Sequence, residues 1–258
     1  GALISNKAGS VNLNEIADAV RYLTDGISKY DKYDYSIIEC LLAGGTEIEF
    51  PDYTNFDGLR AWPVVEIKNL CFQNIRFTGD FVMNNLEVVN DYEFEQSIFD
   101  GIFEGIKIKS IGSSAFNYSK FTGDFNCPNL TTIGNRAFYY SKFTGDFNCP
   151  NLTTVGYDAF LYSQFTGDFN CPNLTTVGNR AFYYSKFTGD FNCPNLTTVG
   201  TEAFFNSNFT QITIGANAML GVNCIGAHSP QFLNDYAANN KLAGTYVWDE
   251  ATQHWIYQ

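Results

Sequence analysis

A 22-residue unit repeats almost unchanged through the middle of the chain. It begins at Phe121 and restarts at Phe143, Phe165 and Phe187, always 22 residues apart. Self-similarity at a fixed period of roughly 20–30 residues is the signature of a solenoid, in which each unit buries its apolar face against its neighbours. The repeat therefore fixes the class of architecture before any other feature is considered.

Weaker copies extend the array in both directions. Stepping back by 22 residues leads from Phe121 to Phe99 and Phe77, and a partial copy begins at Phe209. Terminal units of a solenoid are expected to be atypical because one of their faces has no neighbour. We predict three parts, namely an N-terminal cap over 1–54, the repeat array over 55–215 and a C-terminal cap over 216–258.

Alternating residue types predict a short strand at the start of each unit. In the first clear copy, Phe121 and Phe125 alternate with Thr122, Asp124 and Asn126. A period of two indicates a strand with one buried face. Stacked units would then form a parallel sheet with strands about 4.8 Å apart.

The second half of each unit predicts a turn. Pro128 cannot donate to a β-ladder and should end the strand. Residues 135–138 are then interpreted as one helical or 3₁₀ turn that buries Phe138. The predicted fold is an α/β solenoid with a parallel β-sheet on one face.

The two ends differ in composition from the middle. Apolar residues at helical spacing predict a helix over 11–28, and a second short helix is predicted over 35–42, before an extended piece at 47–50. Residues 231–239 predict another helix, and residues 245–257 predict a β-hairpin that turns near Asp249. We expect a mostly helical N-terminal cap and a C-terminal cap made of a helix plus a β-hairpin.

One motif in the repeats resembles a known family. An apolar residue, Gly, two variable residues, Ala and Phe follow a strand that ends in Cys-Pro-Asn, and this arrangement is similar to the BspA-type leucine-rich repeat. The motif occurs at residues 111–116, 133–138, 155–160, 177–182 and 199–204. The resemblance is strong over roughly residues 100–210 and weak over 55–100. It departs from the family pattern where Phe and Cys replace aliphatic core residues.

The resemblance implies both a fold and a role. It implies a right-handed, leucine-rich-repeat-like array that is secreted or displayed on a cell surface, although no export signal is visible in these 258 residues. It also implies adhesion or binding of a protein or glycan on a host or neighbouring cell. We expect a monomer.

Net charge and hydropathy limit the classes of partner that the chain is expected to bind. The formal net charge is −12 and the isoelectric point is near 4.5, which disfavours nucleic acid and anionic membrane surfaces. The chain has no run of 18 apolar residues, so no membrane span is predicted.

Four of the seven cysteines occupy the same position of successive repeats, at Cys127, Cys149, Cys171 and Cys193. One interpretation is a ladder of disulfides or soft metal ligands. The other is a column of small apolar side chains in the core, and we favour it because side chains in register point the same way, whereas a metal needs convergent ligands. No metal site is predicted.

The sequence has few candidate catalytic residues. The chain has only two histidines, His228 and His254, and neither lies in the repeats. No glycine-rich loop both follows a strand and precedes a full helix, as a phosphate-binding loop would, and the recurring glycines at 123, 145, 167 and 189 are interpreted as structural. We expect no enzymatic activity and no cofactor.

Three columns of identical side chains are candidates for binding. They are the acidic column Asp124, Asp146, Asp168 and Asp190, the amide column Asn126, Asn148, Asn170 and Asn192, and the tyrosine column Tyr118, Tyr140, Tyr162 and Tyr184. A column of carboxylates about 5 Å apart needs cations or hydrogen bonds to offset its repulsion. The Asp and Asn columns are either a surface that binds cations or sugars or a hydrated polar face with hydrogen-bonded Asn ladders. The tyrosine column either contacts carbohydrate or protein or packs between adjacent turns with its hydroxyl groups exposed. Four variable positions in the turns, Arg136, Asp158, Arg180 and Glu202, look unconstrained.

Two functional hypotheses remain open. In the first, the chain is a non-enzymatic surface or secreted recognition module that binds protein or glycan through its repeat faces. In the second, it is a structural spacer or stalk without a specific ligand.

Overall fold

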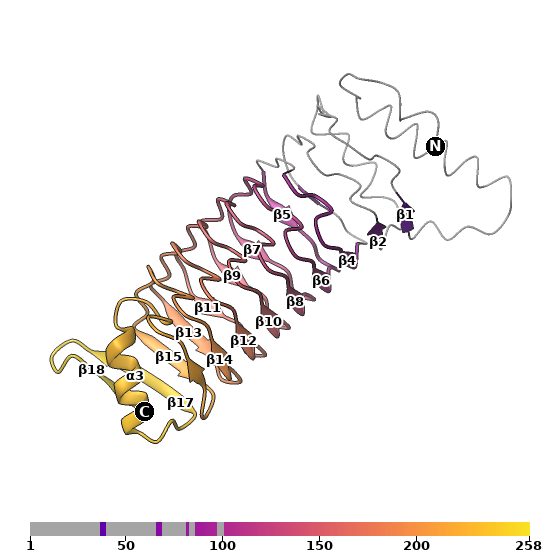
Figure 1. Ribbon diagram of the computed structural model, residues 1–258. Helices are drawn as coiled ribbons and strands as arrows, with labels where there is room; N and C mark the ends of the chain where they lie inside the picture. The colour runs from indigo at the N-terminus through magenta and orange to yellow at the C-terminus, as the bar shows by residue number, and fades with distance from the viewer. Residues whose placement is uncertain (1–36, 40–65, 69–80, 83–85, 97–100) are drawn as a thin grey trace, which may run out of the picture.

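The computed structural model describes residues 37–39, 66–68, 81–82, 86–96 and 101–258 (Figure 1). Over these residues the chain winds into an elongated solenoid whose successive turns stack along one axis (Figure 1). Each turn of the repeat contributes one short strand to each of two sheets. No described helix is long and apolar enough to cross a membrane.

The first sheet has nine strands, all parallel. In the repeats it is built from the Thr-Ile or Thr-Val pair that precedes the motif glycine. Its strands are β1 (Ile37–Glu39), β2 (Glu66–Lys68), β4 (Val88–Val89), β6 (Ser110–Ile111), β8 (Thr132–Ile133), β10 (Thr154–Val155), β12 (Thr176–Val177), β14 (Thr198–Val199) and β16 (Met219–Leu220).

The second sheet also has nine strands and is built mainly from the Phe-Asn pairs. Phe125 pairs with Phe147, so the register steps by one repeat unit. Its strands are β3 (Phe81–Val82), β5 (Phe103–Glu104), β7 (Phe125–Asn126), β9 (Phe147–Asn148), β11 (Phe169–Asn170), β13 (Asp190–Cys193), β15 (Gln211–Ile214), β17 (Gly244–Asp249) and β18 (His254–Tyr257). The last two strands pair antiparallel and the others parallel.

These sheets correct two predictions. The prediction of a sheet on one face only is wrong, because residues 132–133 and their equivalents form a sheet of their own, separate from that of the Phe-Asn pairs. Their β-branched side chains favour extended strands. The predicted helical turn at 135–138 is also wrong, since the described chain between residues 101 and 220 has no helix. The backbone there alternates into the left-handed region at Arg136 (φ 55°) and Tyr140 (φ 68°). The repeats therefore form a β-solenoid.

The N-terminal prediction is wrong where it can be compared with the structure. Residues 37–39, inside the predicted helix over 35–42, form strand β1, which pairs in parallel with β2. Two adjacent isoleucines favour an extended strand over a helix. The predicted helix at 11–28 and the extended piece at 47–50 lie outside the described residues.

Stacked phenylalanines fill the core. Phe160 is fully buried, with its ring centroid 5.0 Å from that of Phe138 and 5.1 Å from that of Phe182, and in both pairs the rings stack in nearly parallel planes. Phe125, from the second sheet, meets Phe160 edge to face at 5.1 Å. Such offset and edge contacts contribute about 0.5–1.5 kcal/mol each beyond area burial. The core is therefore continuous along the solenoid.

The cysteine column lies inside this core. Cys127, Cys149, Cys171 and Cys193 are fully buried and form no disulfide, which confirms the prediction of a buried, unpaired column. Desolvation raises the pKa of the Cys171 thiol to about 12, so it stays protonated at neutral pH.

The motif glycine is required by a close approach of two turns. A Cβ atom on Gly134 would collide with the backbone of Gly112 and Ser113 in the preceding turn. Because glycine has no Cβ atom, the two turns can contact each other at this corner of the solenoid.

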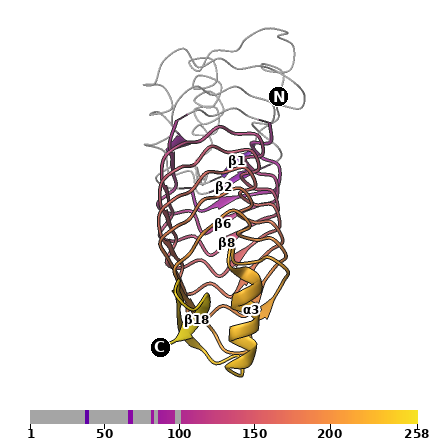
Figure 2. The same ribbon diagram turned by 90° about the vertical axis from the view of Figure 1, so that its left-hand side faces the viewer.

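The C-terminal segment covers the last turn. Helix α3 (Ser229–Ala238) overlaps the predicted helix at 231–239, and β17 and β18 form the hairpin (Figure 1). Figure 2 shows α3 next to β18 at the C-terminal end of the solenoid. Phe232 and Tyr236 of α3 are buried, and the Tyr236 hydroxyl donates to the Gly215 carbonyl at 2.6 Å. These contacts shield the apolar end of the array from water.

Candidate functional site

The candidate site lies on the turn segments that follow the first sheet. We call this surface the turn face, made of residues 113–118, 135–140, 157–162, 179–184 and 201–206. Its backbones are bonded from one turn to the next, because Arg136 N donates to Tyr157 O at 2.9 Å and Phe138 N donates to Ala159 O at 2.8 Å. The bonding repeats in each turn and makes the turn face a rigid platform.

The predicted tyrosine column runs along this platform. Tyr118, Tyr140, Tyr162 and Tyr184 stack with successive centroid distances of 5.2, 4.4 and 5.0 Å. Three of them are well exposed, with Tyr118 at 46%, Tyr140 at 36% and Tyr184 at 40% of the maximum. Because the rings cover one another's faces, the column presents ring edges and hydroxyl groups to solvent.

The tyrosines occupy an unfavourable backbone conformation. Their φ angles are 68° at Tyr118 and Tyr140 and 76° at Tyr162 and Tyr184. For a residue with a Cβ atom the left-handed region costs roughly 1–2 kcal/mol, and a stacked pair returns about 0.5–1.5 kcal/mol. An interior tyrosine such as Tyr140 makes two such pairs, so stacking is of the same size as the backbone cost.

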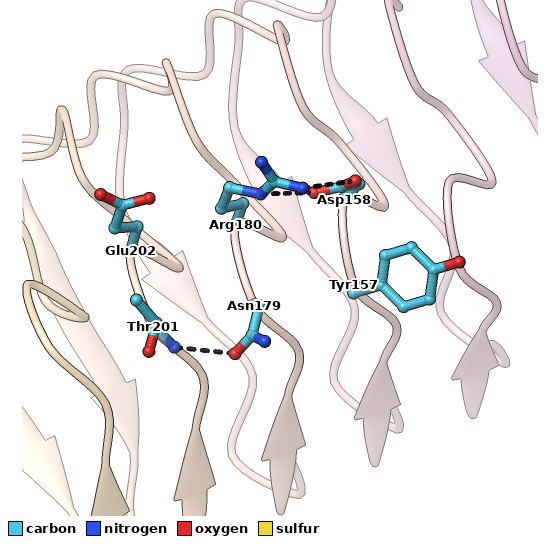
Figure 3. A pocket seen from close by; sticks show the side chains of 6 residues that line it. All are labelled: Tyr157, Asp158, Asn179, Arg180, Thr201 and Glu202. Carbon is cyan, nitrogen blue, oxygen red and sulfur yellow. Dashed lines mark hydrogen bonds and ion pairs between the residues drawn. The ribbon is translucent and has the colours of Figure 1, made fainter.

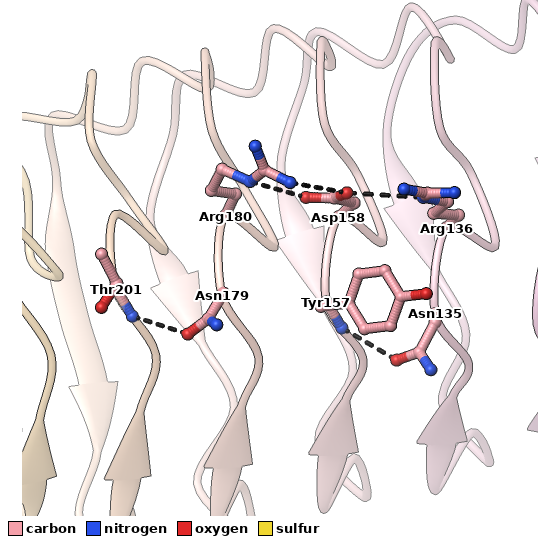
Figure 4. A network of polar contacts seen from close by, with 7 residues as sticks. All are labelled: Asn135, Arg136, Tyr157, Asp158, Asn179, Arg180 and Thr201. Atoms are coloured by element: carbon pink, nitrogen blue, oxygen red, sulfur yellow. Dashed lines mark hydrogen bonds and ion pairs between the residues drawn. The ribbon is translucent and has the colours of Figure 1, made fainter.

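A second row on the turn face consists of the four variable charges, and the interpretation of them as unconstrained is wrong. Figure 4 shows Arg136, Asp158 and Arg180 in line across three turns. The Asp158 side chain is only 2% exposed, although both arginines are about half exposed. The signal was present in the sequence, because the charges alternate in sign at intervals of 22 residues.

The contacts of Asp158 are unequal. Arg180 Nη2 donates to Oδ2 at 3.1 Å, and Arg136 Nε donates to the same oxygen at 3.4 Å. Arg180 Nε lies 3.0 Å from Oδ1, an ion-pair distance, but Oδ1 accepts no hydrogen bond from the described residues. One oxygen of a buried carboxylate thus retains unused acceptor capacity.

Asparagines at the base of the turn face bond to the next turn. Asn135 Oδ1 accepts from Tyr157 N at 3.0 Å, and Asn179 Oδ1 accepts from Thr201 N at 2.9 Å (Figure 4). The two asparagines are two turns apart and play the same role.

A shallow pocket of about 260 Å³ opens on the turn face (Figure 3). The sequence prediction missed all of its residues. The lining side chains are Tyr157, Asp158, Asn179, Arg180, Thr201 and Glu202. Polar and charged groups of both signs therefore surround one cavity.

The other predicted columns lie elsewhere, beside the second sheet. Asp124, Asp146, Asp168 and Asp190 are exposed, and so are Asn126, Asn148, Asn170 and Asn192. Asp124 Oδ1 accepts from Asp146 N at 3.0 Å, and Asp168 Oδ1 accepts from Asp190 N at the same distance. These bonds to backbone amides offset part of the repulsion between the like charges of the column.

In the amide column, one pair of neighbouring side chains forms a hydrogen bond. Asn192 Nδ2 donates to Asn170 Oδ1 at 3.0 Å. Among the described residues no group of three or more His, Cys, Asp or Glu side chains could hold a metal ion.

The two histidines lie in the C-terminal segment, away from the pocket. His228 stacks on Trp248 with ring centroids 3.9 Å apart, and His254 Nδ1 lies 2.8 Å from Asp235 Oδ1. Neither is among the residues that line the pocket of the turn face. They join α3 to the hairpin.

Comparison with known families identifies the repeat. A family model described as the BspA type leucine rich repeat region matches residues 62–166 and 109–226, with six copies. No curated protein and no solved structure matches the chain. The two matched segments together run from residue 62 to residue 226, well over half of the 258 residues, and the chain belongs to the BspA-type leucine-rich repeat family.

Proposed function

We propose that this chain is a non-enzymatic recognition module that binds a protein or glycan through its turn face. The observation that carries the proposal is the tyrosine column, which is exposed and stacked in register. The left-handed φ is not particular to the tyrosines, since Gln96, 22 residues before Tyr118, has it too (φ 59°). Leucine-rich repeat arrays generally act as non-enzymatic interaction scaffolds, and this chain belongs to such a family.

The form of the column favours an extended ligand. Its hydroxyl groups recur with a ring spacing of 4.4–5.2 Å along the solenoid axis. Tyrosine combines an apolar body with a polar tip and suits contacts with proteins and carbohydrates. Identical weak contacts in register add up only if the ligand spans several turns.

The family also supports a setting for this activity. BspA-type repeats are commonly surface-associated, so we place the chain on a cell surface or outside the cell, acting as a monomer. The partner would be a protein or glycan on a host or neighbouring cell. The strongly acidic net charge of −12 argues against nucleic acid.

Two column variants test the proposal against a glycan array and a panel of immobilised extracellular-matrix proteins. The first carries Tyr118→Asn, Tyr140→Asn, Tyr162→Asn and Tyr184→Asn, which suit the left-handed backbone. The second carries Asp124→Asn, Asp146→Asn, Asp168→Asn and Asp190→Asn, which retain an oxygen to accept from the next turn. We expect saturable binding by the parent that falls at least about tenfold in the tyrosine variant and persists in the aspartate variant.

Other outcomes would contradict this assignment. Saturable binding that disappears only in the aspartate variant would move the recognition surface to the second sheet. Absence of saturable binding to every glycan and protein on the panel would favour the spacer hypothesis.

A further inference from the structure

The geometry points to the pocket between turns 157–158, 179–180 and 201–202 as a subsite for one neutral sugar unit of a glycan. This inference rests on the proposed function and specifies its ligand class. The pocket is distinct from the tyrosine column, and its combination of Tyr157 and Asp158 with Thr201 and Glu202 on either side of Asn179 and Arg180 occurs once in the described turns.

The charges around the pocket exclude an anionic ligand. The pocket lining has one positive side chain, Arg180, and two negative ones, Asp158 and Glu202, so its formal charge is −1. Arginine captures carboxylates and phosphates by presenting two parallel N–H groups. In Arg180 that fork already faces Asp158, with Nε and Nη2 at 3.0 and 3.1 Å from its two oxygens. A second anion would therefore meet carboxylates without a free guanidinium fork.

The unused hydrogen-bonding groups suit a polyol. Within the described part of the chain, the Glu202 carboxylate lines the pocket and forms no ion pair, so it is available to accept from a ligand. Asn179 uses its oxygen for Thr201 N, which leaves the amide Nδ2 as a donor on the side away from Thr201 (Figure 3). Sugar hydroxyls both donate and accept, so they can satisfy acceptors and donors placed together.

The size of the pocket suits one ring. A cavity of about 260 Å³ is smaller than the roughly 300–1,000 Å³ that is usual for drug-sized ligands. A longer glycan would leave the pocket across the neighbouring tyrosines, since Tyr183 contacts Tyr184 at 4.6 Å and Tyr184 continues the column. The pocket would select the sugar and the column would add contact length.

Titration calorimetry with methyl glycosides tests this subsite. The probes are the methyl glycosides of glucose, galactose, mannose and N-acetylglucosamine, with methyl glucuronide as the anionic comparator. Asn179→Asp removes the Nδ2 donor but retains the oxygen that caps Thr201, and Glu202→Gln removes the free carboxylate. Asn135→Asp is the matched control, because Asn135 makes the same backbone bond outside the pocket.

We expect at least one neutral glycoside to bind saturably, and both pocket variants to weaken it about tenfold, the effect of losing one hydrogen bond to a charged or polar partner. Asn135→Asp should bind as the parent does, and thermal melts should show all three variants folded. The inference is overturned if no neutral glycoside binds, if methyl glucuronide binds more tightly, or if both pocket variants bind unchanged.

The two proposals fail separately. Loss of glycoside binding in Asn179→Asp with unchanged binding in the tyrosine variant supports the subsite but removes the column from recognition. Array or matrix binding that depends on the tyrosines, with no glycoside bound in the pocket, supports the column and overturns the subsite.

Discussion

Arg180 forms an ion pair with the carboxylate of Asp158 from the following turn of the solenoid, with Nε 3.0 Å from Oδ1 and Nη2 3.1 Å from Oδ2. Arg136 reaches the same carboxylate from the preceding turn at 3.4 Å. Three consecutive turns are thus joined through one side chain that is 2% exposed. These contacts join the turns at the turn face by electrostatic attraction, whereas stacked phenylalanine rings join the turns inside the core.

Asp158→Asn should destabilise the protein by about 1–3 kcal/mol, because two guanidinium groups lose a shared buried partner. The loss should stay below the larger values seen for fully buried pairs, since both arginines reach solvent. Asparagine accepts the left-handed backbone at this position (φ 54°), so the substitution isolates the charge. Urea denaturation measures the effect, with the exposed Asp124→Asn as control. Equal curves for the two variants would mean that the ion pairs contribute nothing.

Phe160→Ala should cost about 3–5 kcal/mol, the usual range for truncating a buried aromatic side chain. Phe160 has stacked rings on both faces, at Phe138 and Phe182, so the cavity cannot collapse easily. Phe205→Ala is a suitable comparison because Phe205 is 38% exposed and stacks on a single ring, that of Tyr183. A loss below about 1 kcal/mol at Phe160 would contradict the observed packing.

Tyr140→Asn should change the free energy of unfolding by less than about 1 kcal/mol, although it removes two stacked contacts. Relief of the left-handed strain at φ 68° offsets the lost stacking. Chemical denaturation of the parent and the variant is the test. A destabilisation above about 2 kcal/mol would show that the column is chiefly structural.

Stability should fall as the pH rises above about 9. Desolvation raises the pKa of Cys171 from 9.0 to about 12, so between these values the unfolded chain releases a proton that the folded chain retains. The stabilisation from this group is therefore complete below pH 9 and is lost with rising pH, at up to about 1.4 kcal/mol per pH unit. Tyrosines add to the same slope, so the useful quantity is the difference between the parent and Cys171→Ala from pH 8 to 11. Parallel pH profiles would refute the burial of this thiol.

The sequence predicts the features that recur identically. A period of 22 residues places Phe125 on Phe147 and Cys127 beside Cys149, and the structure confirms both the pairing and the buried column. Identity between copies makes the register unambiguous, because any other alignment would break every column at once. The family and the solenoid fold follow from the same regularity.

Short elements and turns without glycine escaped prediction. Strand β8 has two residues, too few for alternation to be visible, so the first sheet was missed. The turn face has Arg136 and Tyr140 in the left-handed region, which residue preferences assign to glycine or asparagine. The pocket and the ion pairs depend on residues that differ between copies, and they become visible only when positions are compared down a column.

Because the charges in the row alternate in sign, losing an odd number of units from it has a different effect from losing an even number. Deleting one unit, residues 143–164, would keep every phenylalanine in phase but would set Arg136 against Arg180 with no carboxylate between them. Deleting two units, residues 143–186, would bring Arg136 next to Glu202 and keep opposite signs adjacent. The apolar core permits growth and shrinkage by single copies, whereas the charged row favours gain or loss in pairs. Length variants that gain or lose units between Arg136 and Glu202 should therefore differ by even numbers of units.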